Sequence, residues 1–283
     1  MPENNNGGES FSKRLIRARE LYRTGDWNAA ATLYHQLIDE APKYHMSPYE
    51  LWVELAWSYY HLKRYESTLI CLKQVTEKSP DYPKMADVYR LSAQCQAFLG
   101  RTKLALESWQ KALKIIPDGD PLKKEVEFEI AQVHFQRGEF SIAKKYFDEL
   151  SDYFKYETDD AKAANYLYQF GFTEYYLRNY VNAEKYFEEM FHLASDNATK
   201  ALALYGKAFI QFNDSRYEAL IGTVEEILEL NPEFQDKESL AYFMCVSYKS
   251  LNDRIKFDMF FNELKKNYPE GRYSEYYDDL QKW

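Results

Sequence analysis

The side chains in this sequence best suited to nucleophilic, acid–base or metal chemistry are five histidines and three cysteines. The histidines are scattered along the chain: His35, His45, His61, His134 and His192. No H-E-x-x-H, C-x-x-C, G-x-G-x-x-G or P-loop pattern is present. The sequence therefore predicts no catalytic site, no cofactor and no metal centre, and the protein is not expected to be an enzyme.

The cysteines Cys71, Cys95 and Cys245 are odd in number and far apart, which favours buried, reduced thiols over a disulfide framework. The net charge is −9, and residues 121–283 alone carry −10, which argues against a nucleic-acid partner. No apolar run approaches the roughly 18 residues of a membrane span. The N-terminus, MPENNNGGES, has no apolar signal region, so a cytoplasmic protein is expected, or a periplasmic one if a signal peptide was removed.

The elements that position these side chains follow a repeat. In LALESWQKALKIIP, residues 104–117, Ala105, Trp109 and Ala112 share one helical face, and Pro117 ends the run. Similar stretches recur at 29–42, at 67–80 and in four later copies, seven in all. Each copy follows a second helical pattern, best seen in LWVELAWSYYHLKRY, residues 51–65. The unit is therefore helix, short turn, helix, repeated every 37 to 40 residues.

At these residues the chain resembles the tetratricopeptide repeat (TPR) family, whose pattern is W-x2-L-G-x2-Y…A-x3-F…P on a period of about 34 residues. The resemblance implies an all-α fold, a right-handed superhelical solenoid of helix-turn-helix hairpins forming one domain. Seven repeats are expected over 11–270, with starts near 11, 49, 86, 124, 164, 201 and 238. Residues 1–10 are expected to be a disordered tail and 271–283 a capping helix. The closing stretch, NYPEGRYSEYYDDL, is also similar to TPR proteins of bacterial envelope assembly.

Small residues explain how such hairpins pack. Ala56 and Ala93 on first helices, like Ala105 on a second helix, let paired helices approach closely. Trp109 and Phe187 are expected to fill the gap to the next repeat. The hairpin turns are marked by glycines expected to end first helices in a left-handed conformation: Gly25, Gly100 and Gly138.

In a TPR stack the first helices line the concave surface. The positions offset from the buried stripe become aromatic from residue 168 onward: Tyr168, Phe172, Tyr205, Phe209 and Tyr242. The N-terminal end offers Arg19, Arg23 and Trp57. These eight residues are the predicted partner-binding set, the aromatics as anchors and the arginines as electrostatic guides. Two alternatives stay open, because the rings could pack on one another and the arginines could belong to an ordinary solvated helix.

The functional hypothesis is a non-enzymatic scaffold that binds a peptide or helix of a protein partner in its concave groove. The alternative is a structural subunit of a larger assembly, for example in a bacterial envelope or motility machine, joined through convex faces and ends. A carboxylate clamp for chaperone C-termini is not expected, because the matching slots hold Leu15, Arg19, Val53 and Trp57. The sequence makes no prediction of oligomeric state.

Overall fold

A computed structural model describes residues 10–282 of the chain. Every regular element in this part of the chain is a helix, which confirms the all-α prediction. The chain divides into two compact units, Met1–Val133 and His134–Trp283, where the sequence predicted one continuous domain. The division falls inside helix α7, Pro121–Gln136, which no break in the repeat pattern marks. The predicted tail lies almost entirely outside the described residues.

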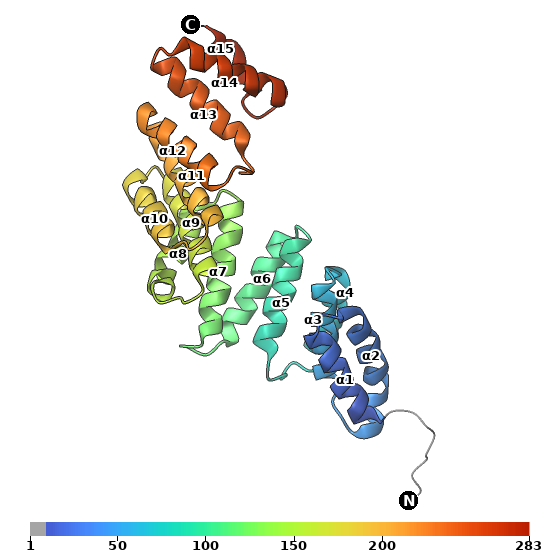
Figure 1. Ribbon diagram of the computed structural model, residues 1–283. Coiled ribbons are helices and arrows are strands. Elements are labelled where there is room, and N and C mark those ends of the chain that lie inside the picture. The colour runs from blue at the N-terminus through green and yellow to red at the C-terminus, as the bar shows by residue number, and fades with distance from the viewer. Residues whose placement is uncertain (1–9, 283) are drawn as a thin grey trace, which may run out of the picture. The chain divides into compact units, whose positions relative to one another are not determined.

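The first unit is built from three helical hairpins followed by most of α7 (Figure 1). Its six paired helices are α1 (Phe11–Arg23), α2 (Trp27–Glu40), α3 (Tyr49–His61), α4 (Tyr65–Lys78), α5 (Met85–Phe98) and α6 (Thr102–Ile115). A short 3₁₀ turn, η1 (Ala41–Tyr44), follows α2. Helix α2 also packs against α3, and α4 against α5, as repeat stacking requires.

The second unit continues the same alternation of first and second helices (Figure 1). Its helices are α8 (Phe140–Lys155), α9 (Asp160–Tyr176), α10 (Tyr180–Leu193), α11 (Asn197–Asn213), α12 (Tyr217–Leu230), α13 (Lys237–Ser250) and α14 (Arg254–Asn267). A closing segment holds η2 (Ser274–Tyr276) and α15 (Tyr277–Gln281). Among the described residues, no helix combines the length and apolarity needed to cross a bilayer.

Close helix approach at small residues sets the core of the second unit. The buried ring of Phe187 on α10 lies between Gly171 on α9 and Gly206 on α11. A Cβ added at Gly171 would come within 2.7 Å of this ring, and one added at Gly206 would overlap it. The two glycines therefore allow one phenylalanine to join three helices. The corresponding residues Ala56 and Ala93 in the first unit are fully buried, as predicted.

Every hairpin turns through three residues, and the middle residue has a positive φ. These left-handed residues are Gly25, Lys63, Gly100, Gly138, Arg178, Ser215 and Asn252. The turn at Gly25 shows the common hydrogen-bond pattern, with Gly25 N donating to Tyr22 O (3.1 Å) and Asp26 N donating to Leu21 O (2.9 Å). This is the Schellman arrangement, which satisfies carbonyls at the helix end. The three glycine predictions are confirmed, and four turns form without glycine.

Ring stacking joins neighbouring hairpins beside these turns. In three places the first residue of a second helix stacks on the last residue of the next first helix. The pairs are Trp27–His61 (4.8 Å between centroids), Tyr65–Phe98 (4.8 Å) and Phe140–Tyr176 (4.3 Å). These stacked ring pairs stabilise the contacts between neighbouring repeats on the side where the hairpins turn.

The closing segment packs against the last hairpin. Tyr277 donates a hydrogen bond from its hydroxyl to the carbonyl of Tyr268 (2.7 Å). Lys249 on α13 donates from Nζ to the carbonyls of Asp279 (2.8 Å) and Leu280 (3.0 Å). Since helix C-termini leave carbonyls without partners, Lys249 stabilises the end of α15.

The packing of Phe187 predicts opposite effects for two glycine-to-alanine substitutions. Gly206→Ala is expected to lower the free energy of unfolding by about 1–3 kcal/mol, because the new methyl group displaces the ring. Gly222→Ala, in α12, is expected to raise it by about 0.5–1 kcal/mol, because its Cβ meets open space in a helix interior. Urea denaturation of both variants measures the difference. Equal effects would contradict the proposed role of Gly206.

Candidate functional site

The predicted aromatic residues of the second unit lie on the face formed by the first helices α9, α11 and α13. Phe172 contacts Tyr168 (4.8 Å between centroids) and Phe209 (5.7 Å), and Tyr205 contacts Phe209 (4.9 Å). The structure therefore brings four of the five predicted aromatics into one cluster. Most of the ring pairs meet edge to face, the arrangement that aromatic quadrupoles favour.

This cluster is partly self-packed. Phe172 is only 5% exposed and packs on Phe187 as well as on its predicted neighbours, so it belongs to the core. Tyr205 is 8% exposed. Tyr168 and Phe209 are half-buried and keep ring surface on the face. Of the two alternatives left open by the sequence, self-packing therefore describes Phe172, whereas Tyr168 and Phe209 present accessible rings.

Tyr242 lies apart from this cluster. Its ring stacks on Tyr273 of the closing segment, with 4.0 Å between centroids and 8° between planes. The Phe212 ring also lies near Tyr242, with 5.8 Å between centroids. The stacking on Tyr273 covers one ring face of Tyr242, which the sequence treated as open to a partner.

A pocket of about 410 Å³ opens beside the aromatic cluster. We call it the groove pocket; it lies between α9, α11 and the link from α12 to α13. Its walls include Tyr168, Leu202, Tyr205, Phe234 and Asp236. Leu202 is 39% exposed, which is high for a leucine on this face. An apolar wall with a few polar groups at the rim is typical of a site that accepts one side chain of a partner.

Asp236 fixes the polar side of the groove pocket. Its carboxylate accepts hydrogen bonds from the Tyr205 hydroxyl and from Ser239 Oγ (2.9 Å), and it pairs with Arg272. Burial acts to raise the pKa of Asp236, but the hydrogen bonds from Tyr205 and Ser239 and the nearby Arg272 outweigh burial and lower it. Burial, together with the bond to Asp236, raises the pKa of Tyr205. The carboxylate is thus held ionised and locks the Tyr205 ring in place.

Sequence reasoning missed Leu202, Phe234 and Asp236. Phe234 and Asp236 belong to the link between repeats, which the repeat pattern does not cover. One signal was available for Asp236, since an aspartate just before a helical run is a common N-cap. In the structure its side chain accepts from the backbone N–H of Ser239 (3.2 Å).

The predicted residues of the first unit form a smaller site. Arg19 pairs with Glu54, with 2.8 Å between Nη2 and Oε1, and its side chain is 49% exposed. Both residues line a pocket of about 160 Å³ together with Tyr22, Tyr34 and Trp57. Because Glu54 balances the charge of Arg19, this arginine contributes less net attraction for an acidic partner than the sequence suggested.

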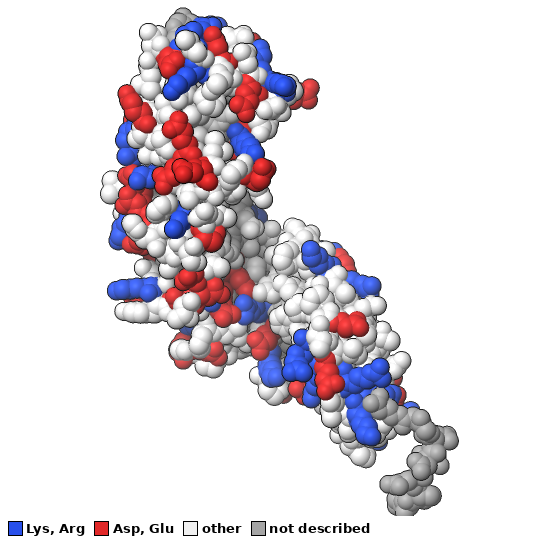
Figure 2. Space-filling model, viewed as in Figure 1, with Lys and Arg blue, Asp and Glu red and all other residues white. Residues whose placement is uncertain are grey.

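Arg23 is exposed at the end of α1. Basic residues gather on this helix, which carries Lys13, Arg14, Arg17, Arg19 and Arg23 (Figure 2). Acidic side chains are prominent on the visible face of the second unit (Figure 2). The excess of acidic residues that the sequence places in residues 121–283 is therefore visible on the surface of the second unit, and the first unit carries a basic helix.

Groups that could do chemistry are held apart or neutral. Cys71, Cys95 and Cys245 are buried, and burial raises the pKa of each thiol to about 12. Such thiols are poor nucleophiles at neutral pH. Within residues 10–282, no three His, Cys, Asp or Glu side chains group in a way that could hold a metal ion.

Comparison with known proteins connects this architecture to a family. A family model for the tetratricopeptide repeat matches residues 17–67. A TPR repeat-containing protein of Methanocaldococcus jannaschii is 27% identical over 219 residues, which are 74% of this chain and 35% of the relative. The solved C-terminal part of a TPR repeat-containing protein from Cytophaga hutchinsonii superposes with a TM-score of 0.68 at 19% identity, over 95% of this chain and 100% of that one. Residues 17–67 are thus similar in sequence to the tetratricopeptide repeat, and the chain has the fold of TPR proteins.

TPR folds generally mediate protein–protein interaction, and proteins of the family are generally non-catalytic scaffolds. The chain spans about a third of the length of the M. jannaschii relative (35%). A similar fold also occurs in the Cut9–Hcn1 hetero-tetramer of the APC/C, with a TM-score of 0.61 at 14% identity, over 95% of this chain and 49% of that one. Within residues 10–282, fifteen α-helices fit the prediction of about seven repeats.

The Asp236 network predicts a pH-dependent effect. Asp236→Asn is expected to lower the free energy of unfolding at pH 7 by about 1.5–3 kcal/mol, because charge-assisted hydrogen bonds are weakened. The folded-state pKa is depressed, so the carboxylate stabilises above its ordinary value of 3.8 and stops doing so as the pH falls through the lowered pKa. Denaturation curves from pH 7 to pH 2.5 should therefore show the two proteins converging in acid. A difference that stays constant over this range would show that Asp236 acts only through its shape.

Proposed function

We propose that this protein is a non-enzymatic scaffold that anchors an apolar side chain of a protein partner in the groove pocket of its second unit. The observation that carries the proposal is the exposed leucine among aromatic walls. Leu202 and Tyr168 present apolar surface beside a rigid carboxylate, Asp236, which is already satisfied within the chain. A peptide or helix that inserts one aliphatic or aromatic residue fits this arrangement.

The rigidity of the pocket supports this function. Tyr205 is held by Asp236, and Phe234 packs on Tyr205 with 5.1 Å between centroids. Preformed walls lower the entropy that a partner's binding must overcome. The predicted anchors therefore divide in their roles: Tyr168, Phe209 and Tyr242 face the partner, Tyr205 forms a wall of the groove pocket, and Phe172 supports the cluster from the core. Arg19, Arg23 and Trp57 of the first unit remain proposed as secondary contacts.

A structural role in a larger assembly is the second candidate, and exposed aliphatic residues at the turn edge favour it. Val181 at the start of α10 is 84% exposed, and Ile255 at the start of α14 is 85% exposed. Met259, one helical turn after Ile255, is 57% exposed. Aliphatic side chains this accessible are typical of contact surfaces when they cluster.

A matched pair of leucine substitutions separates the two candidates. Leu202→Lys places a charge in the groove pocket, whereas Leu251→Lys places the same charge at the turn edge on a side chain of similar exposure, 37%. Partners enriched on the wild-type protein from lysate, quantified by mass spectrometry, should fall by at least about tenfold with Leu202→Lys and persist with Leu251→Lys. Both variants are first checked for unchanged thermal unfolding.

The reverse result would favour the assembly role. If Leu251→Lys removes the partners and Leu202→Lys retains them, the turn edge is the working surface. A photo-crosslinking amino acid at position 202, compared with one at 255, then gives an independent readout, because only the residue in contact forms a covalent adduct.

A further inference from the structure

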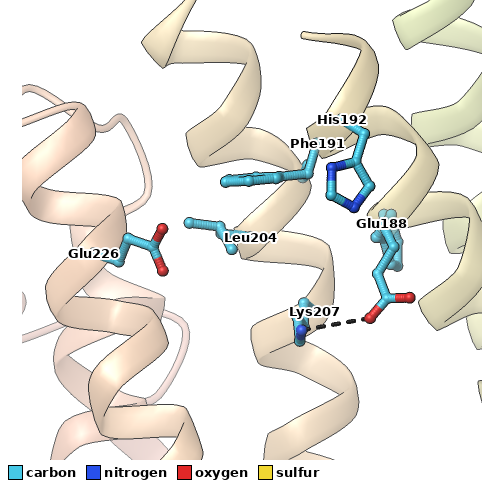
Figure 3. A pocket seen from close by; sticks show the side chains of 8 residues that line it. Glu188, Phe191, His192, Leu204, Lys207 and Glu226 are labelled. Carbon is cyan, nitrogen blue, oxygen red and sulfur yellow. Dashed lines mark ion pairs between the residues drawn. The ribbon is translucent and has the colours of Figure 1, made fainter.

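The outward side of the second unit carries another pocket, on the side of α11 opposite the groove pocket. It lies between the second helices α10 and α12, with α11 between them, and has a volume of about 340 Å³ (Figure 3). We call it the outer pocket. Phe191, Ala203 and Leu204 supply its apolar surface, and Glu188, Lys207 and Glu226 lie around it. Neither Leu202 nor Tyr168 lines it, so it is separate from the proposed binding groove.

The outer pocket is associated with one small residue. Ala203 occupies a buried position that stands five residues before the small packing residue of each first helix. The other first helices from α3 to α13 carry larger residues there, all buried: Leu51, Val88, Val126, Tyr166 and Leu240. Only α11 has alanine among these six, and the side chain missing from this position leaves space above Leu204.

The preceding repeat shows what a ring at this position does. The Tyr166 ring stacks on Phe154 with 4.2 Å between centroids. Its hydroxyl donates a hydrogen bond to the carbonyl of Phe147 (3.0 Å). The depression there, between α8, α9 and α10, is also open, at about 510 Å³, but the chain itself covers the ring face. Phe191 packs at the edge of a small cluster formed by Ala164, Met190 and Ala203, and its ring also meets the edge of His192 at 6.0 Å and the Nζ of Lys200 at 5.9 Å. Among the described residues, no aromatic ring stacks face to face on Phe191.

The charge around the outer pocket selects the chemistry of what could enter. Helix α12 carries Glu218, Glu225, Glu226 and Glu229 and no lysine or arginine. Figure 3 shows Glu226 on α12, across from Leu204, while Lys207 pairs with Glu188 at 3.6 Å. Within the described part of the chain, Glu226 forms no ion pair. The uncompensated charge on the α12 side of the pocket is therefore negative, whereas Lys200 adds a positive charge beside Phe191; a basic partner is favoured at the Glu226 side.

We propose that the outer pocket is a second docking site, for a basic segment of a partner protein that inserts one bulky apolar side chain against Phe191. The apolar residue fills the space that Tyr166 fills one repeat earlier. Lysine or arginine residues beside it face Glu226 and the rest of α12. The inserted side chain gives the affinity, and the charges orient the segment and speed its approach.

The experiment is a selection of random 12-residue displayed peptides on the full-length protein, with counter-selection on Ala203→Leu. Leucine is the residue that positions 51 and 240 carry, so the substitution fills the pocket with a side chain that the repeat accepts. Enriched peptides should share one aromatic or large aliphatic residue flanked by lysine or arginine. Ala203→Leu should weaken their binding by at least about tenfold in fluorescence anisotropy.

Two charge reversals on one helix provide the control. Glu226→Lys, at the pocket, should weaken the selected peptides by about three- to tenfold, whereas Glu218→Lys, which changes the net charge equally but does not line the pocket, should have a smaller effect. Thermal unfolding verifies that each variant folds, and Ala203→Val replaces Ala203→Leu if leucine overpacks the site. Leu202→Lys should leave these peptides bound, so failure of this proposal and failure of the groove proposal are distinguishable.

The proposal is overturned if the selected peptides bind Ala203→Leu as tightly as the wild type. It is also overturned if they are acidic, if they lack an apolar residue, or if Glu218→Lys and Glu226→Lys weaken them equally. In the last case the acidic helix would attract basic peptides by charge alone, with no docking position.

Discussion

Close helix packing at small residues is the constraint on which both proposed sites depend. In the second unit, Phe187 inserts its ring between Gly171 and Gly206, and a single added methyl group at either position would force the ring to move. Because three helices meet at this ring, their spacing is fixed there. The groove pocket on one side and the outer pocket on the other are both held in shape by this contact. The two surfaces therefore share one rigid support.

The two proposed sites use different chemistry on this common frame. The groove pocket combines rings with a carboxylate whose hydrogen bonds are all made within the chain, so its polar groups add shape rather than net charge. The outer pocket combines one uncovered ring with a helix of four glutamates, so charge has a direct part in its selectivity. A scaffold with these two surfaces could hold an apolar segment on one side and a basic segment on the other.

The repeat pattern was sufficient to predict the helices and their pairing, because small and bulky residues recur at fixed spacing. It was less successful with helix starts: α9 and α11 begin four residues before the expected 164 and 201 and reach 17 residues each. Asp159 and Asp196 cap these extra turns, and the repeat motif does not include them. Within the site, the offset of a position from the buried stripe of its helix does not distinguish Phe172, which is buried, from Phe209, which is half-buried. That difference depends on the Phe187 ring and on links between repeats, which sequence spacing does not describe.

The three-residue turn is the same in all seven hairpins, whereas the links between hairpins differ in length, from three residues after α10 to eight after α2, where the link includes η1. The turn inside each repeat therefore has a constant length, whereas the link between repeats varies in length. Four of these turns have a non-glycine residue in the left-handed conformation, so their geometry is imposed by the flanking helices rather than by glycine. Changes in the length of a link can then alter how one hairpin follows the next without disturbing either hairpin. In a chain of this kind, new surface grooves can arise by lengthening or shortening a link, while the core of each repeat keeps its sequence.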